Sequence, residues 1–197
     1  DRGYFFKQLD TVKPSEGSAS LAPVFNAARE WADHRSAGRK ELVVITDNQT
    51  AAWDWPADGF FRREWKRDGT SLVVLAPDTQ PLPGWLQQLS ACLARDASIA
   101  TATPWSNAGE AASWPRLGEI TEPPHDTERT AAACAAMPPM HPELPAAVTH
   151  AVALRGSARQ RAGGLDASSY GSWYAALIDL SMRLSGLGWR NALCETA

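Results

Sequence analysis

The sequence predicts an α/β fold in which a mostly parallel sheet lies between layers of helices. Two short, continuous apolar runs, at residues 42–45 and 72–75, are typical of strands that are buried on both faces, and residues 99–103 are a third predicted strand. Residues 60–67 and 84–95, which separate these strands, have the character of helices. Strands that alternate with helices in this way favour a parallel sheet with crossover helices.

The rest of the chain fits one domain. Residues 104–145 are rich in proline and predict a surface excursion with room for one helix. The remaining predicted elements are a helix at 21–35, a strand at 147–154, a short helix at 157–162 and a last helix at 172–187. We therefore expect a single domain over residues 1–197, with halves at 1–103 and 104–197, and leave open that it is a piece of a longer chain.

Composition excludes several classes of protein. The 197 residues are 44% hydrophobic and 21% charged, as in a globular domain, and the net charge of −3 comes with no block of like charge. Neither nucleic acid nor an anionic membrane is therefore an expected partner. The apolar runs are too short for a transmembrane helix. Three dispersed cysteines without a Cys-x-x-Cys pair indicate reduced thiols and a cytoplasmic protein without structural zinc.

Two of the predicted strands are followed by an aspartate. Asp47, with Asn48 beside it, follows the run at 42–45, and Asp78 follows the run at 72–75. Ligands of parallel α/β sheets bind at the carboxyl ends of the strands, so both aspartates are candidate ligand-binding residues. For Asp78 a second interpretation stays open, because an aspartate also caps turns that precede a helix.

The C-terminal third resembles the acceptor-side half of family-two glycosyltransferases. Arg161-Ala-Gly-Gly-Leu-Asp166 resembles the family's R-x-G-G-(L/F)-D turn. Asp179-Leu-Ser-Met-Arg183 resembles the end of its E-(D/E)-x-D-(L/F)-x-x-R loop, and Gly188-Trp-Arg190 resembles its G-W-R. The resemblance implies the GT-A fold, a three-layer Rossmann-like α/β architecture in which helices flank a mostly parallel sheet.

Two earlier segments extend this resemblance. Residues 72–79 with 83–86 resemble the DxD-type segment v-v-L-(N/D)-x-D-(T/D)…p-g-W-L, with alanine at the first polar position. Residues 99–109 with 113–116 resemble a-T-v-(T/S)-P-(F/L)-S-N-n-(G/A)…s-(Y/F)-P-r. Asparagine and serine at these positions are also typical of an ordinary turn after a strand.

The resemblance implies a nucleotide-sugar donor and a glycan or other hydroxyl acceptor, with inversion at the transferred sugar. It places a divalent cation, Mg²⁺ or Mn²⁺, on the carboxylate of Asp78, in keeping with the preference of these ions for oxygen ligands. The other residues that it assigns to the donor are Asp47, Asn48, Ser106 and Asn107. The residues assigned to the acceptor are Trp173, Tyr174 and Arg183.

The catalytic base is where this sequence departs from the family. The position of the usual base falls on Leu177, and alanine precedes it. Asp179 and Asp166 are the candidate replacements, and Glu195 is a further one. For Asp179 an alternative is a structural ion pair with Arg183, one helical turn later. Without a base, the chain would be a GT-A-like binding or scaffold module.

A second resemblance concerns the N-terminal part. Residues 18–28 followed by 41–49 resemble von Willebrand A-type domains, which bind Mg²⁺ beside a strand that ends in (T/S)-D-G. The D-x-S-x-S loop of that family is absent from the sequence. A metal-dependent interaction module centred on Asp47 is therefore the third alternative.

Overall fold

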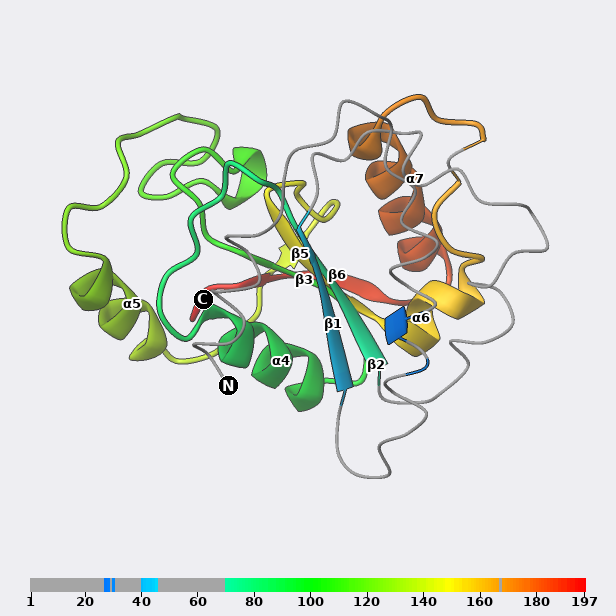
Figure 1. Cartoon of the computed structure of the whole chain (residues 1–197), viewed down its shortest axis with the longest axis horizontal. Coiled ribbons are helices and arrows are strands. Elements are labelled where there is room, and N and C mark those ends of the chain that lie inside the picture. The colour runs from blue at the N-terminus through cyan, green and yellow to red at the C-terminus, as the bar shows by residue number, and fades with distance from the viewer. Residues whose placement is uncertain (1–26, 29, 31–39, 46–69, 167) are drawn as a thin grey trace.

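The computed structural model describes residues 27, 28, 30, 40–45, 70–166 and 168–197. Its centre is a six-stranded sheet in the order β1-β2-β5-β3-β6-β4 (Figure 1). The strands are β1 (Lys40–Ile45), β2 (Thr70–Leu75), β3 (Ile99–Pro104), β4 (Glu143–Leu144), β5 (Ala151–Arg155) and β6 (Arg190–Cys194). The predicted α/β class is confirmed.

Four of the six strands run in one direction. β1 pairs with β2 and β3 with β6 in parallel, whereas β5 is antiparallel to both of its neighbours and β4 is antiparallel to β6. The sheet is therefore mostly parallel but mixed. The direction of β5 was not predicted, because an apolar run does not encode which way a strand points.

Helices cover both faces of the sheet. α4 (Trp85–Arg95) lies on one side, and α6 (Gly156–Arg161) and α7 (Trp173–Gly186) lie on the other (Figure 1). β2 shows how the sequence divides between the two faces. Val73 packs with the buried leucines of α4, while Leu72 and Val74 pack with those of α7. Since successive side chains of a strand alternate between faces, one apolar run supplies both cores.

The long helix α7 has a clear start and a clear inner face. The hydroxyl of Ser172 caps it by accepting a hydrogen bond from the backbone N–H of Ala175. Its end is marked by Gly188, whose φ of 84° is a left-handed conformation that favours glycine. The buried residues recur at helical spacing: Trp173, Ala176, Leu177, Leu180, Ser181 and Leu184.

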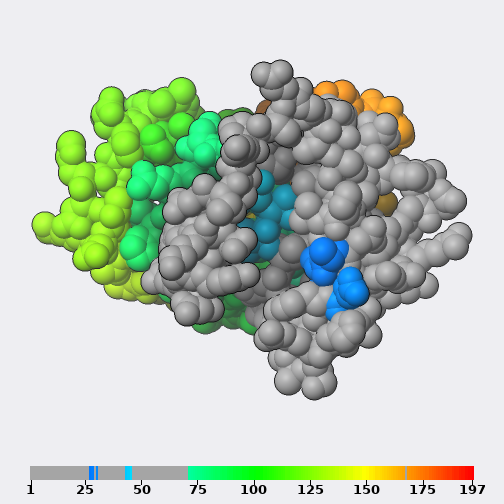
Figure 2. Space-filling view, viewed as in Figure 1, coloured from blue at the N-terminus to red at the C-terminus, as the bar shows by residue number. Residues whose placement is uncertain are grey.

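The predicted surface excursion is present. Between β3 and β5 the chain forms the short 3₁₀ helix η1 (Glu110–Ala112), the helix α5 (Thr127–Ala135) and the edge strand β4. α5 has no fully buried residue, which agrees with its position at the periphery. In Figure 2 the green to yellow-green residues of this excursion form the left flank of the visible face.

Some predictions fall on residues that the structure does not describe. These are Asp47, Asn48 and the helix at 60–67; of the helix predicted at 21–35, only residues 27, 28 and 30 are described, and they are helical. Among the described helices, none combines the length and the apolar character needed to cross a bilayer.

Candidate functional site

The candidate site lies where β2 and β3 end and β5 begins. Leu75, the last residue of β2, pairs with Ala151, the first residue of the antiparallel β5. The residues that follow β2 and β3 and those that precede β5 therefore share one edge of the sheet, which we call the carboxyl edge. Asp78, Ser106 and His150 all lie there.

His150 joins the segments at this edge. Its backbone carbonyl accepts hydrogen bonds from the N–H of Ala76 at 2.9 Å and from the hydroxyl of Thr79 at 3.1 Å. Its ring Nε2 lies 3.0 Å from the carbonyl oxygen of Pro104. A carbonyl can only accept, so we assign the ring proton to Nε2. His150 thus holds the Asp78 turn against the end of β3.

The ring of His150 is neutral at physiological pH. Burial lowers its pKa from the ordinary value of 6.5 to about 4, although the Pro104 carbonyl and the charge of Asp78 act in the opposite direction. Its Nδ1 is buried and has no hydrogen-bond partner in the part of the chain that the structure describes. Sequence reasoning missed His150, because only the antiparallel direction of β5 brings it to this edge.

Asp78 lies exposed in the turn after β2. It does not cap the following helix, because the N-cap of α4 is Gly84 and no side chain caps that helix. Within the described residues there is no group of three or more His, Cys, Asp or Glu placed to hold a metal ion.

Ser106 and Asn107 hold the loop after β3 together. The Ser106 N–H donates to the carbonyl of Ala112 at 2.9 Å, and the Ser106 hydroxyl accepts from the N–H of Ala108 at 3.2 Å. The side-chain NH₂ of Asn107 donates to the backbone carbonyl of Thr121 at 2.8 Å. The backbone carbonyl of Asn107 accepts from the Thr121 N–H, also at 2.8 Å. Both side chains act in the architecture of the loop.

Gly109 brings this loop against His150. A Cβ at Gly109 would lie 2.9 Å from Cβ of Ser106, 3.0 Å from Cε1 of His150 and 3.1 Å from the carbonyl oxygen of Ala112. There is no room for a side chain there, so the sequence needs glycine at this point. The loop after β3 therefore packs on the imidazole of His150, while the backbone carbonyl of the same residue holds the Asp78 turn.

Asp179 and Arg183 form the ion pair expected from their spacing of one helical turn. Nη2 and Nε of Arg183 lie 2.6 and 2.8 Å from Oδ2 of Asp179, and Tyr170 donates to Oδ1 at 3.1 Å. Arg183 also donates to the carbonyls of Ala162 and Gly164, which follow α6. This arrangement fastens the turn after α6 to the side of α7.

Asp166 and Glu195 are also engaged. One oxygen of Asp166 accepts from the hydroxyl of Ser168 and from the N–H groups of Ser168 and Ser169, and these bonds lower its pKa to about 2. Glu195 is buried. Burial opposes its ionisation, but hydrogen bonds from the N–H groups of His141 and Met140 outweigh that effect and lower its pKa.

The first turns of α7 point their apolar residues inward. Trp173 and Leu177 are buried in the core of the α7 face, and Ala176 is buried as well. Tyr174 is exposed, and its hydroxyl lies 3.5 Å from Oε2 of Glu110, in η1. This contact links the start of α7 to the loop after β3.

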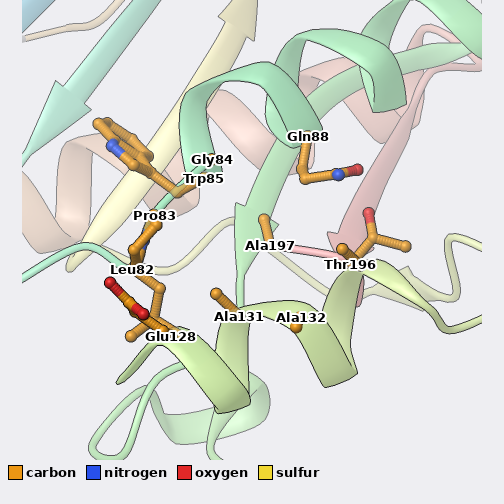
Figure 3. A pocket seen from close by; sticks show the side chains of 11 residues that line it. Leu82, Pro83, Gly84, Trp85, Gln88, Glu128, Ala131, Ala132, Thr196 and Ala197 are labelled. Atoms are coloured by element: carbon orange, nitrogen blue, oxygen red, sulfur yellow. The ribbon is translucent and has the colours of Figure 1, made fainter. Parts of the chain in front are cut away.

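A separate hollow of about 300 Å³ lies between α4, α5 and the end of the chain (Figure 3). Gln88 stands on its α4 wall, Ala131 and Ala132 on its α5 wall, and Thr196 beside them. None of the candidate donor or acceptor residues is among the described residues that line it, and Glu128 is the one charged side chain among those. We therefore locate the candidate site at the carboxyl edge.

The sequence matches no protein-family model, and no curated protein is significantly similar to it.

Proposed function

We propose that this chain is a glycosyltransferase-like domain that transfers a sugar from a nucleotide-sugar donor to a hydroxyl acceptor with inversion. The observation that carries the proposal is spatial. Of the five sequence segments that resemble family-two glycosyltransferases, four are joined by one series of contacts, although they are spread over the chain from residue 72 to residue 183. Through His150 the Asp78 turn meets the loop after β3, and Glu110 of that loop meets Tyr174 of α7. Arg183 then ties α7 to the glycine turn at Gly164.

The proposed role of Asp78 is to hold Mg²⁺ or Mn²⁺. An exposed carboxylate that does not cap a helix remains available for a cation, and the cation in turn would bind the donor's diphosphate. A bound cation offsets the negative charge that develops on the leaving diphosphate. The backbone carbonyl of His150 holds this turn, and the neutral ring adds no charge of its own at pH 7.

Calorimetric titration of nucleoside diphosphates in the presence of Mn²⁺ tests the donor site. We expect binding by the wild type and a loss of about tenfold or more in affinity for Asp78→Asn, the size expected for one charged contact. Glu128→Gln removes an exposed carboxylate from α5 and serves as the matched control, with unchanged affinity. A folded wild-type sample that binds none of the diphosphates would refute the proposal.

One observation favours a second candidate, a GT-A-like module that binds without catalysis. Position 177 is a buried leucine, and Asp166, Asp179 and Glu195 are each held by structural partners. Hydrolysis or transfer of a sugar nucleotide separates the two candidates. Turnover that disappears in Asp78→Ala excludes the binding module, whereas tight binding with no turnover supports it.

A further inference from the structure

The loop after β3 presents an unusual glutamate to the carboxyl edge. Glu110 has a φ of 50°, a left-handed conformation that residues with a side chain rarely adopt. Within the described residues, only one other residue with a side chain, His141, has a positive φ. Such conformations persist where the surrounding structure imposes them, and they are concentrated at functional sites.

The surroundings of Glu110 impose its conformation through the backbone. Its carbonyl accepts hydrogen bonds from the N–H of Ser113 at 3.1 Å, from the N–H of Gly118 at 2.9 Å and from the Ser113 hydroxyl. Directly before it, Gly109 is packed against His150 with no space for a Cβ. The main chain of Glu110 is therefore held rigidly between the base of the candidate site and the rest of the loop.

The side chain of Glu110 is left exposed by the same arrangement. The contact that we find for its carboxylate is a long one, 3.5 Å from Oε2 to the hydroxyl of Tyr174. Tyr174 stands in the first turn of α7, one turn before Leu177. The carboxylate of Glu110, which belongs to another segment, thus lies near the start of α7. At that end of the helix, α7 itself has a leucine at position 177.

Glu110 also differs from Asp179, the carboxylate of α7, in where it lies. Asp179 lies six residues after the start of α7 at Trp173, which corresponds to about 9 Å along the helix axis and away from the carboxyl edge. It is also neutralised by Arg183. Glu110 is adjacent in sequence to Gly109, which packs on the ring of His150, and the backbone carbonyl of His150 accepts hydrogen bonds from the Asp78 turn.

We propose that Glu110 is the general base of the reaction, an assignment that rests on the proposed transferase function. The carboxylate removes the proton from the attacking hydroxyl while the oxygen of that hydroxyl forms a bond to the anomeric carbon of the donor sugar. The bond from the anomeric carbon to the phosphate oxygen breaks, and its electron pair leaves with the nucleoside diphosphate. Glu110 ends the step protonated, and the sugar ends with inverted configuration.

Hydrolysis of sugar nucleotides tests this assignment without knowledge of the acceptor, because water then takes the acceptor's place. UDP-glucose, GDP-mannose and dTDP-rhamnose with Mn²⁺ are suitable probes. We expect Glu110→Gln to lower kcat by roughly 10²–10⁴-fold and to leave the calorimetric affinity for the nucleoside diphosphate unchanged. Glu119→Gln removes a second exposed carboxylate from the same loop and is expected to keep wild-type turnover.

Azide distinguishes a base from a residue that only supports the loop. Azide is already an anion and needs no deprotonation, so Glu110→Ala with azide is expected to form a glycosyl azide whose configuration is opposite to that of the donor. Structural damage would abolish this reaction together with hydrolysis.

The outcomes separate the two proposals. If the wild type binds no nucleotide, the proposed transferase function and the Glu110 assignment are both refuted. If donor binding is intact and Glu110→Gln hydrolyses at the wild-type rate, the Glu110 assignment alone falls. The same holds if azide fails to restore turnover. If the wild type binds the donors but hydrolyses none of them, the Glu110 assignment is refuted and the module that binds without catalysis is favoured.

Discussion

The loop after β3 and the segment from Gly163 to Arg183 use their polar groups in opposite ways. In the loop, backbone groups and the side chains of Ser106 and Asn107 hold the fold, and the carboxylate of Glu110 stays exposed. In the segment, the carboxylates themselves hold the fold, with Asp179 on Arg183 and Asp166 on its own turn. An acidic residue in a motif is therefore not evidence of catalysis until its partners are known.

The largest expected effect concerns position 177, which is a core position in this structure. Leu177 is fully buried among the side chains of the α7 face. We expect Leu177→Ala to lower the free energy of unfolding by about 3 kcal/mol, because it leaves a cavity in the core. Met182→Ala, on the exposed face of the same helix, should change it by less than about 0.5 kcal/mol. Equal effects of the two substitutions in urea denaturation would contradict the placement of α7.

The second largest expected effect concerns the ion pair between Asp179 and Arg183. Arg183→Met leaves Asp179 without its charged partner and removes the donors that serve the carbonyls of Ala162 and Gly164. We expect a loss of roughly 2 kcal/mol in the free energy of unfolding. This figure allows for solvent screening, since the side chain of Arg183 is 33% exposed. Arg161→Met, at the exposed end of α6, is the control and should have little effect.

The affinity for nucleotide gives a second test of the role of Asp179. If Asp179 is structural, Arg183→Met should leave the affinity of the folded protein for Mn²⁺ and nucleoside diphosphate unchanged. A loss of nucleotide affinity larger than the loss at Asp78→Asn would instead move the donor site towards α7.

The smallest expected effect, when it is measured over a single pH unit, concerns pH and His150. Its pKa is about 4 in the folded protein and 6.5 ordinarily, so the unfolded chain binds more protons in this window. Stability should therefore fall as the pH decreases below 6.5, by about 1 kcal/mol over the first pH unit, and the loss should continue until the pH approaches 4. His150→Gln should remove this dependence, while His125→Gln, at an exposed position, should keep it. Urea denaturation at a series of pH values measures the difference in slope.

Much of the fold could be predicted from local patterns. The strands β1, β2 and β3 and the helices α4, α6 and α7 lie within a few residues of their predicted bounds. Their signals are local, since continuous apolar runs and helical spacing depend on neighbouring residues alone. The helix within the surface excursion was likewise expected, as α5.

β6 shows why other elements could not be predicted. It begins with arginine and asparagine, which do not suggest a strand inside a sheet, yet Asn191 is fully buried. The side chain of Asn191 accepts from the hydroxyl of Thr101 and donates to the carbonyl of Ser181 and the hydroxyl of Ser185. A buried amide is tolerated because distant residues satisfy it, and a local pattern contains no information about them.

The sequence by itself determined the α/β class, most of the elements and the candidate position of Asp78 after β2. These follow from periodicity and from the order of strands and helices, which are properties of neighbouring residues. The tertiary structure alone decided the direction of β5, the arrival of His150 at the carboxyl edge and the separation of engaged from exposed carboxylates. Each of these depends on contacts between residues that are distant in the chain, and such contacts form only when the sheet has been assembled.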